Sequence, residues 1–218
     1  MIRHHPGEDL ILAYAGGAGD EATSLIVATH LGFCAECRRA VALAETMGGA
    51  LMQSLAPAPL SGGALAATLA RLDAPLPPVS ARLKSVVQPK SKDGTPSPLR
   101  AYLGGDLSQV RWRRMGASLA WAPLFRRGGV KVKLLKGVAG SDTGLHSHRG
   151  LEFTLVLQGG FTDESGSYAP GDLQVAASDI WHNPVADPGE DCINLSVTTA
   201  PLKFKGLVPK IAGRLAGF

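Results

Sequence analysis

Residues 140–159 read "GSDTGLHSHRGLEFTLVLQG", in which two histidines stand two positions apart and a glutamate follows four positions later. On a β-strand, residues i and i+2 point to the same face, so the imidazoles of His146 and His148 are expected to reach one point. Glu152 begins the next run of β-type residues after a short turn and can bring a carboxylate to that point. His182, in the later stretch "DIWHNP", is available as a fourth ligand.

Three imidazoles and one carboxylate suit zinc, iron, manganese, nickel or copper. In the alternative interpretation, His146 and His148 are loop histidines that face solvent. The spacing G-x5-H-x-H-x3-E-x6-G, from Gly140 to Gly159, and the "APGD" ahead of His182 favour the metal site. This pattern resembles the cupin superfamily, and the resemblance implies a small β-barrel with a metal in its mouth.

The sequence after residue 98 is typical of a β domain. Its β-type runs are short and are separated by glycine and proline: "VRWRRM", "SLAWAPLF", "VKVKLL", "EFTLVLQG", "GSYAPGDLQVAA" and "CINLSVTT". No stretch between them is long enough for a crossover helix. The sheet is therefore expected to be antiparallel and to close as a sandwich or small barrel.

The first third of the chain has helical periodicity instead. Residues 8 to about 72 predict four short helices. The first ends at Gly16, the second has Asp20 as its N-cap, the third restarts after Gly32, and the fourth has Ser61 as its N-cap.

A second group of metal-ligating residues lies in residues 29–37, "THLGFCAEC". His30 ends one helix, and Cys34 and Cys37 lie one turn apart at the start of the next, so the three can converge on Zn²⁺. Structural zinc takes four ligands, and the other histidines in this half are His4 and His5. The alternative is a pair of small buried cysteines beside a surface histidine.

Proline, serine and lysine dominate residues 76–98, which predict a flexible linker. The chain is then divided into a helical zinc-binding domain (residues 1–75), this linker, and a cupin-like metal-binding domain (residues 99–218). The predicted fold class is α+β with two domains, a small four-helix domain followed by an antiparallel β-barrel.

The formal net charge of +4 is distributed unevenly over the 218 residues. Four basic residues stand against seven acidic ones in residues 1–75, thirteen against two in residues 76–140, and five against nine in residues 141–218. The helical part is thus acidic, which argues against DNA binding because phosphates need a cationic surface. The basic stretches "RWRR" and "FRRGG" of the middle segment are more typical of solvated surface.

The sequence predicts a cytoplasmic protein. No run approaches the roughly 18 apolar residues that a membrane span requires, and the N-terminus lacks the apolar region of a signal peptide. The three cysteines, Cys34, Cys37 and Cys192, are too few for a disulfide framework.

Taken together, the two halves are similar to the ChrR-type zinc-binding anti-sigma factors. The stretches "RHHPGEDLILAYAGG", "VATHLGFCAEC", "LVLQGGF" and "PLKF" carry the resemblance and span nearly the full chain. The resemblance implies that His5 completes a zinc site with His30, Cys34 and Cys37. It also implies that the helical domain binds and inhibits an extracytoplasmic-function sigma factor. The cupin domain, with Zn²⁺ or another divalent transition metal, would release that factor under singlet-oxygen or related oxidative stress.

The chain departs from that family in the segment "DCINL". Where the family carries two cysteines, this chain has Cys192 and then Asn194, so no disulfide can form there. Cys192 is expected to be a small residue of the barrel core.

An enzymatic function is the alternative. A cupin metal with an open coordination position can catalyse dioxygenation or isomerisation, with the helical domain as an accessory. An enzyme has no evident use for a separate zinc module, so we favour a regulatory protein without catalytic activity. Its expected partner is a sigma factor, with no direct DNA contact and no membrane association.

Overall fold

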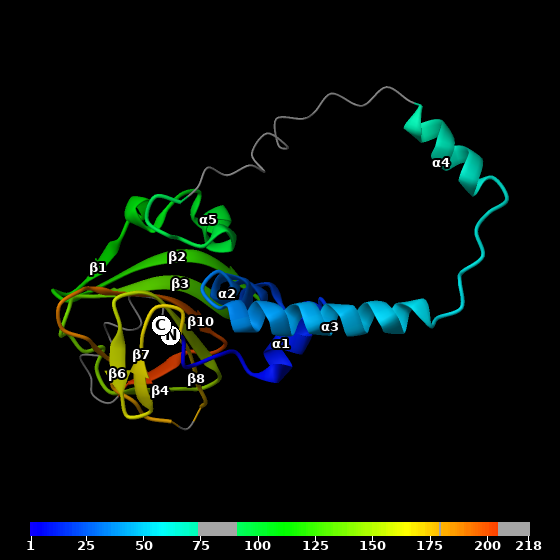
Figure 1. Cartoon of the computed structure of the whole chain (residues 1–218). Helices are drawn as coiled ribbons and strands as arrows, with labels where there is room; N and C mark the ends of the chain where they lie inside the picture. Colours follow the sequence, from blue (N-terminus) through cyan, green and yellow to red (C-terminus); the bar gives the residue numbers. More distant parts are fainter. Residues whose placement is uncertain (74–90, 179, 205–218) are drawn as a thin grey trace. The chain divides into compact units, whose positions relative to one another are not determined.

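The computed structural model describes residues 1–73, 91–178 and 180–204 of the chain (Figure 1). A helical region comes first and a β domain follows, which confirms the predicted fold class in outline. None of the helices in these ranges is long and apolar enough to cross a membrane.

The helical region contains the four predicted helices, α1 (Glu8–Ala15), α2 (Glu21–Leu31), α3 (Ala35–Gln53) and α4 (Ala64–Leu72). Asp20 caps α2 as predicted, because its carboxylate accepts hydrogen bonds from the main-chain N–H groups of Ala22 and Thr23. The predicted cap of the last helix is wrong: α4 begins at Ala64 with Gly63 at its N-cap, not with Ser61.

The strands pair only in antiparallel fashion within the described residues, as predicted. They form a six-stranded sheet in the order β1-β2-β3-β10-β5-β8, a two-stranded sheet β11-β4 and a three-stranded sheet β7-β6-β9. Their bounds are β1 (Arg113–Met115), β2 (Leu119–Arg127), β3 (Val130–Gly137), β4 (His146–His148), β5 (Glu152–Gln158), β6 (Phe161–Asp163), β7 (Gly166–Tyr168), β8 (Leu173–Ala176), β9 (Val185–Ala186), β10 (Cys192–Thr198) and β11 (Leu202–Phe204).

The run "GSYAPGDLQVAA" is two strands rather than one. β7 and β8 belong to different sheets, and residues 169–172 turn between them. Asp172 is fully buried in this turn, and its carboxylate accepts a hydrogen bond from the Ala169 N–H at 2.9 Å. A buried acid needs such partners, so this turn is a fixed part of the fold.

A further helix, α5 (Ser97–Leu103), lies where the sequence predicts a linker followed by strands. Pro98 stands in its first turn, where proline fits a helix, and Leu99 is fully buried. Most of the predicted linker (residues 76–98) falls on residues 74–90, outside the described part of the chain. Its described end, residues 91–98, leads into α5.

Contacts group the chain into two compact units, one of residues 1–45 with 91–218 and one of residues 46–90. Helices α1 and α2 and the start of α3 therefore share a unit with the β domain. The predicted division into domains of residues 1–75 and 99–218 concerns independent folding, which contacts do not test, and it stays a prediction.

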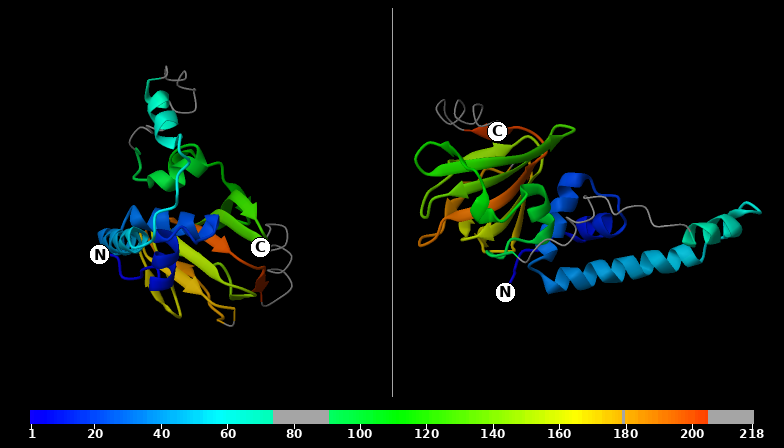
Figure 2. Two further views of the ribbon diagram at one scale, coloured as in Figure 1. Left: turned by 90° about the vertical axis from the view of Figure 1, so that its right-hand side faces the viewer. Right: turned by 90° about the horizontal axis from the view of Figure 1, so that it is seen from above.

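Helix α2 packs the helical region against the six-stranded sheet. It contacts β3, β5 and β10 and also α5, and Figure 2 shows α1 and α2, in blue, beside the β domain. Leu25 and Ile26 of α2 are buried in one apolar cluster with Leu99 of α5 and the inner side chains of the sheet, among them Leu134, Leu155, Leu195 and Val197. One core thus holds both parts together.

We expect Ile26→Ala to lower the free energy of unfolding by about 2–5 kcal/mol, because Ile26 is only 1% exposed and the change leaves a cavity in the shared core. Denaturant titration followed by circular dichroism and by tryptophan fluorescence of the β domain should show both signals shifting together. Leu12→Ala, at a position 60% exposed, is the control and should change stability by less than about 0.5 kcal/mol. Separate helical and fluorescence transitions would contradict the shared core.

Candidate metal centres

The first cluster brings together His5, His30, Cys34 and Cys37, whose ligand atoms all lie within 4.8 Å of one another. The Sγ atom of Cys37 is 3.3 Å from His5 Nδ1 and 3.2 Å from His30 Nε2. Three of the four side chains are buried, and His5 is half-buried. Two imidazoles and two thiols in this arrangement could hold a metal ion with tetrahedral preference.

The turn between α2 and α3 positions three of these residues. The Cys34 N–H donates to the His30 carbonyl at 3.0 Å, which fixes the chain reversal. Gly32 is required there, because a Cβ at this position would lie 2.9 Å from Pro96 Cβ. The Cys37 N–H then donates to Cys34 Sγ at 3.4 Å, because the two residues are three positions apart in the first turn of the helix.

The β domain orients His30. Its Nδ1 lies 2.8 Å from the carbonyl oxygen of Gly171, which can only accept, so Nδ1 carries the proton and donates. The bare Nε2 then faces Cys37. Burial lowers the pKa of His30 and raises the pKa of the Cys37 thiol, so without a metal both groups favour their neutral forms.

The structure also separates the two N-terminal histidines that the sequence left as alternatives. His5 faces the cluster, whereas the ring of His4 lies against Tyr168 with the centroids 4.4 Å apart. The main chain of His4 is held by the β domain, because its N–H donates to Asp172 at 2.9 Å and its carbonyl accepts from Leu173 at 3.0 Å. This anchoring turns the next residue, His5, toward the thiols.

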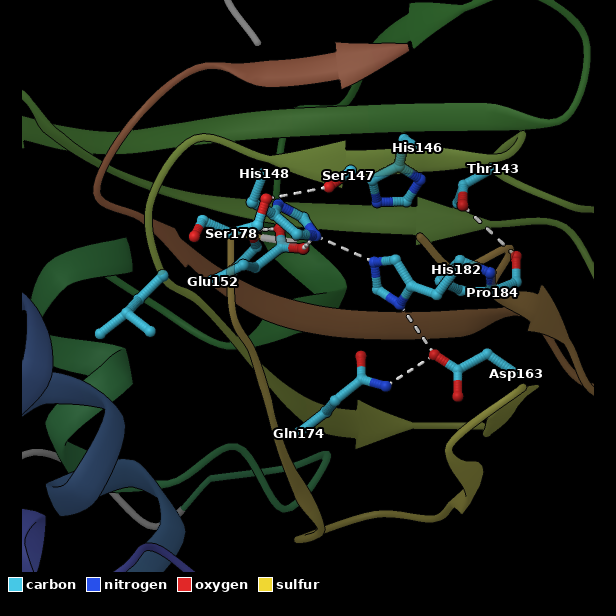
Figure 3. A network of polar contacts seen from close by, with 12 residues as sticks. Thr143, His146, Ser147, His148, Glu152, Asp163, Gln174, Ser178, His182 and Pro184 are labelled. Atoms are coloured by element: carbon cyan, nitrogen blue, oxygen red, sulfur yellow. Dashed lines mark hydrogen bonds and ion pairs between the residues drawn. The ribbon is translucent and has the colours of Figure 1, made fainter. Parts of the chain in front are cut away.

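The second cluster contains the four residues predicted for it, His146, His148, Glu152 and His182, all buried and with ligand atoms within 4.8 Å of one another. Figure 3 shows their side chains pointing toward one another. His148 Nε2 lies 2.9 Å from His182 Nε2 and 3.3 Å from Glu152 Oε2. β4 supplies two histidines, β5 begins with the glutamate, and an isolated bridge pairs His182 with His146.

Neighbouring groups orient these side chains for a metal. His146 Nδ1 donates to the carbonyl of Gly144 at 2.8 Å, and His182 Nδ1 donates to Asp163 at 2.8 Å. The Ser196 hydroxyl donates to Glu152 at 3.0 Å. A bare His182 Nε2 facing a second imidazole nitrogen at 2.9 Å needs a proton or a cation between them. The residues present therefore fit a metal ion.

Burial dominates the electrostatics of this cluster. It lowers the pKa of His146 and brings the pKa of His148 down to about 4, against the opposing effect of Glu152. Burial alone would raise the pKa of Asp163, but hydrogen bonds from His182, Ser165 and Gln174 hold that pKa well below its ordinary value. The lowered pKa values favour the neutral forms of His146 and His148, which are the forms in which histidine binds a metal.

A cavity of about 250 Å³ reaches this cluster, lined by His146, Glu152 and His182 together with Phe161, Cys192 and Asn194. Cys192 is also packed in an apolar cluster with Phe161, and it is 3% exposed. It is therefore a core residue, as predicted, that also borders the cavity.

The groups that orient the clustered histidines could not be predicted from the sequence. Asp163 stands 19 positions from His182, Gly171 stands 141 positions from His30, and Asp172 stands 168 positions from His4. Gln174 acts through Asp163, and no spacing rule connects any of these pairs. The stretch "APGD" contains Gly171 and Asp172, but it does not indicate which residues they contact.

Comparison with known proteins identifies the family of the chain. Residues 102–202 match the family model described as the ChrR cupin-like domain. The chain is 43% identical over 211 residues to the anti-sigma-E factor ChrR of Cereibacter sphaeroides, covering 96% of both chains. It is also similar to the crystal structure of Rhodobacter sphaeroides SigE in complex with the anti-sigma ChrR, with 40% identity, a TM-score of 0.77, and coverage of 91% of this chain and 99% of that chain.

We expect the metal-free chain to lose stability as the pH falls from about 6.5 toward 4. The unfolded chain binds a proton on histidine near pH 6.5, whereas His148 in the fold takes one only near its pKa of about 4. Protons therefore favour unfolding in this window. Thermal unfolding with a chelator present should show the midpoint falling, on the order of 2–4 °C for each kcal/mol lost.

His148→Gln, which removes the titrating group, is the control for this pH dependence. Its midpoint should fall less steeply over the same window. An equal slope in both proteins would show that other groups cause the acid sensitivity.

Proposed function

Since the chain belongs to the ChrR family of anti-sigma factors, we propose that it binds an extracytoplasmic-function sigma factor and keeps it inactive. The observation that carries this proposal is the 43% identity over 96% of both chains with an anti-sigma-E factor. A similar chain in complex with SigE supports the same kind of partner. This role is regulatory and requires no catalytic turnover. A sigma factor as partner supports a cytoplasmic location.

The apolar side chains exposed on α3, on α4 and on the segment between them support a protein partner. Every side chain of α4 is at least partly exposed, although the helix is rich in leucine. A helix of nine residues is unstable unless its apolar face is buried. The large apolar residues exposed here are Leu43, Met47, Leu51, Met52, Leu55, Leu60, Leu65, Leu69 and Leu72. We infer that a sigma factor covers them.

The first cluster is proposed to hold Zn²⁺ through His5, His30, Cys34 and Cys37. Two thiolates and two imidazoles match the closed tetrahedral set of structural zinc. The metal would neutralise the thiolates and bind the N-terminal arm to the α2–α3 turn. Its role is therefore to stabilise the part of the helical region that packs on the β domain.

The second cluster is proposed to hold Zn²⁺ or another divalent transition metal through His146, His148, Glu152 and His182. The cavity of about 250 Å³ beside it gives small molecules access. We propose that this cupin domain makes release of the sigma factor responsive to singlet oxygen or related oxidants. Thiolate and imidazole side chains are chemically suited to such oxidation.

We expect the double change Leu65→Asp and Leu69→Asp on α4 to weaken sigma binding by at least about 30-fold. This factor corresponds to roughly 2 kcal/mol, the loss typical of an interface hot spot. Titration of the full chain with the extracytoplasmic-function sigma factor of the same organism, followed by calorimetry, measures it. Val138→Asp, at an exposed position of the β domain, is the control and should bind like the unaltered chain. If the unaltered chain forms no complex with any such sigma factor of its host, the proposed function is wrong.

We expect the unaltered chain to carry two metal ions and the double variant Cys34→Ser, Cys37→Ser to carry one. His146→Ala with Glu152→Gln should also remove one ion, from the other site. Elemental mass spectrometry of the purified proteins counts the metals. Cys192→Ser is the matched control, because its thiol belongs to neither cluster, and both ions should remain.

A further inference from the structure

Both imidazoles of the first cluster depend on one turn of the β domain. The fully buried Asp172 accepts hydrogen bonds from the N–H groups of Arg3 at 2.7 Å and His4 at 2.9 Å, which places His5. One residue earlier, the Gly171 carbonyl accepts from His30 Nδ1 at 2.8 Å. The thiols come from Cys34, directly before α3, and Cys37 in its first turn, so this cluster is assembled where the helical region meets the turn.

The same turn leads directly to the second cluster. Two residues after Asp172, the amide of Gln174 on β8 donates to Asp163 Oδ2 at 2.6 Å. That oxygen also accepts from His182 Nδ1 at 2.8 Å. Figure 3 shows dashed lines that join Asp163 to His182 and to Gln174. Gln174 and Asp163 therefore orient a metal ligand without belonging to the ligand set.

Residues 171–174 are held rigidly between the two clusters. The Gly171 N–H donates to the carbonyl of Val156 at 2.9 Å, and the Val156 N–H donates to the carbonyl of Asp172 at 3.1 Å. Gly171 has φ +92°, and a Cβ there would lie 2.8 Å from Ile2 and 2.9 Å from Phe33. Residues 171 and 172 are therefore hydrogen-bonded to β5 and closely packed by the N-terminal arm, and Gln174 follows two residues later on β8.

We propose that residues 171–174 couple the two metal sites, so that emptying the second site weakens metal binding at the first. The proposal rests on the proposed binding of a metal at both clusters. A metal at His182 Nε2 would fix that ring; without one, the ring would keep only its contacts with Asp163 and His148. A shift of Asp163 would then be passed to β8 through the amide of Gln174. The same four residues contain Gly171, whose carbonyl accepts from His30, and Asp172, which holds the main chain next to His5. A change at the second site would thereby reach the ligands at the start of α3.

Cobalt substitution in the full chain tests this coupling. Only the first site has thiolate ligands, so the charge-transfer absorption from cysteine to Co²⁺ reports that site alone. Competition with a chelator gives its Co²⁺ affinity in the unaltered chain and in His182→Ala, which empties the second site. We expect the affinity of the first site to fall by roughly 5-fold or more, the lower end of typical coupling between sites.

Gln174→Met tests the route, because methionine keeps the length of the side chain and removes its hydrogen bonds. In the Gln174→Met background, His182→Ala should no longer change the cobalt affinity of the first site. Gln158→Met, at a half-buried position on β5, is the matched control and should leave the full effect of His182→Ala in place. A second pair applies if Gln174→Met does not fold: Asp163→Asn keeps an acceptor oxygen and should preserve the coupling, whereas Asp163→Leu should abolish it.

The outcomes separate the coupling from the function on which it rests. An unaltered chain without a charge-transfer band overturns the metal site itself, and with it the coupling. A band with equal affinity in the unaltered chain and His182→Ala overturns the coupling alone. An effect of His182→Ala that has the same size with and without Gln174 shows a different route and overturns the role of residues 171–174.

Discussion

The hydrogen bond from His30 to the carbonyl of Gly171 links the last turn of α2 to the β domain at 2.8 Å. His30 is fully buried, so this acceptor cannot be replaced by water. The bond also sets the tautomer that leaves Nε2 facing the two cysteines. This contact and the buried Asp172 beside it position the first cluster and the N-terminal arm. They also join α2 to the β domain, on which it packs.

The helical region has two parts that differ in whether their apolar side chains are buried. Helices α1 and α2 and the start of α3 bury their apolar side chains in clusters that include the first two cysteines and the inner face of the sheet. The end of α3 and α4 leave their leucines and methionines exposed. The first part packs on the β domain and contains the His/Cys cluster, and the second carries the surface that we propose for the sigma factor.

Much of both clusters could be predicted from the sequence, because their ligands follow local geometry. His146 and His148 share one face of a strand, and Cys34 and Cys37 lie one turn apart on a helix. Helix α5 was missed although Pro98 at its start is a recognised helix signal, because the proline-rich composition around it favours a linker. The split of "GSYAPGDLQVAA" into β7 and β8 was missed because both halves have β-type composition, and only pairing assigns them to different sheets.

The sequence by itself determined seven of the eight side chains that the two clusters bring together, the antiparallel β domain and the helical region, because these depend mainly on residue type and local spacing. It left His4 and His5 as alternatives, since adjacent residues differ only in the direction they face. The tertiary structure decided between them by anchoring the main chain of His4 on Asp172, which lies 168 positions away. It also decided that Gly171 orients His30 and that Gln174 and Asp163 orient His182. Contacts of this kind form only when the chain has folded, because they join residues whose separation in sequence carries no periodic signal.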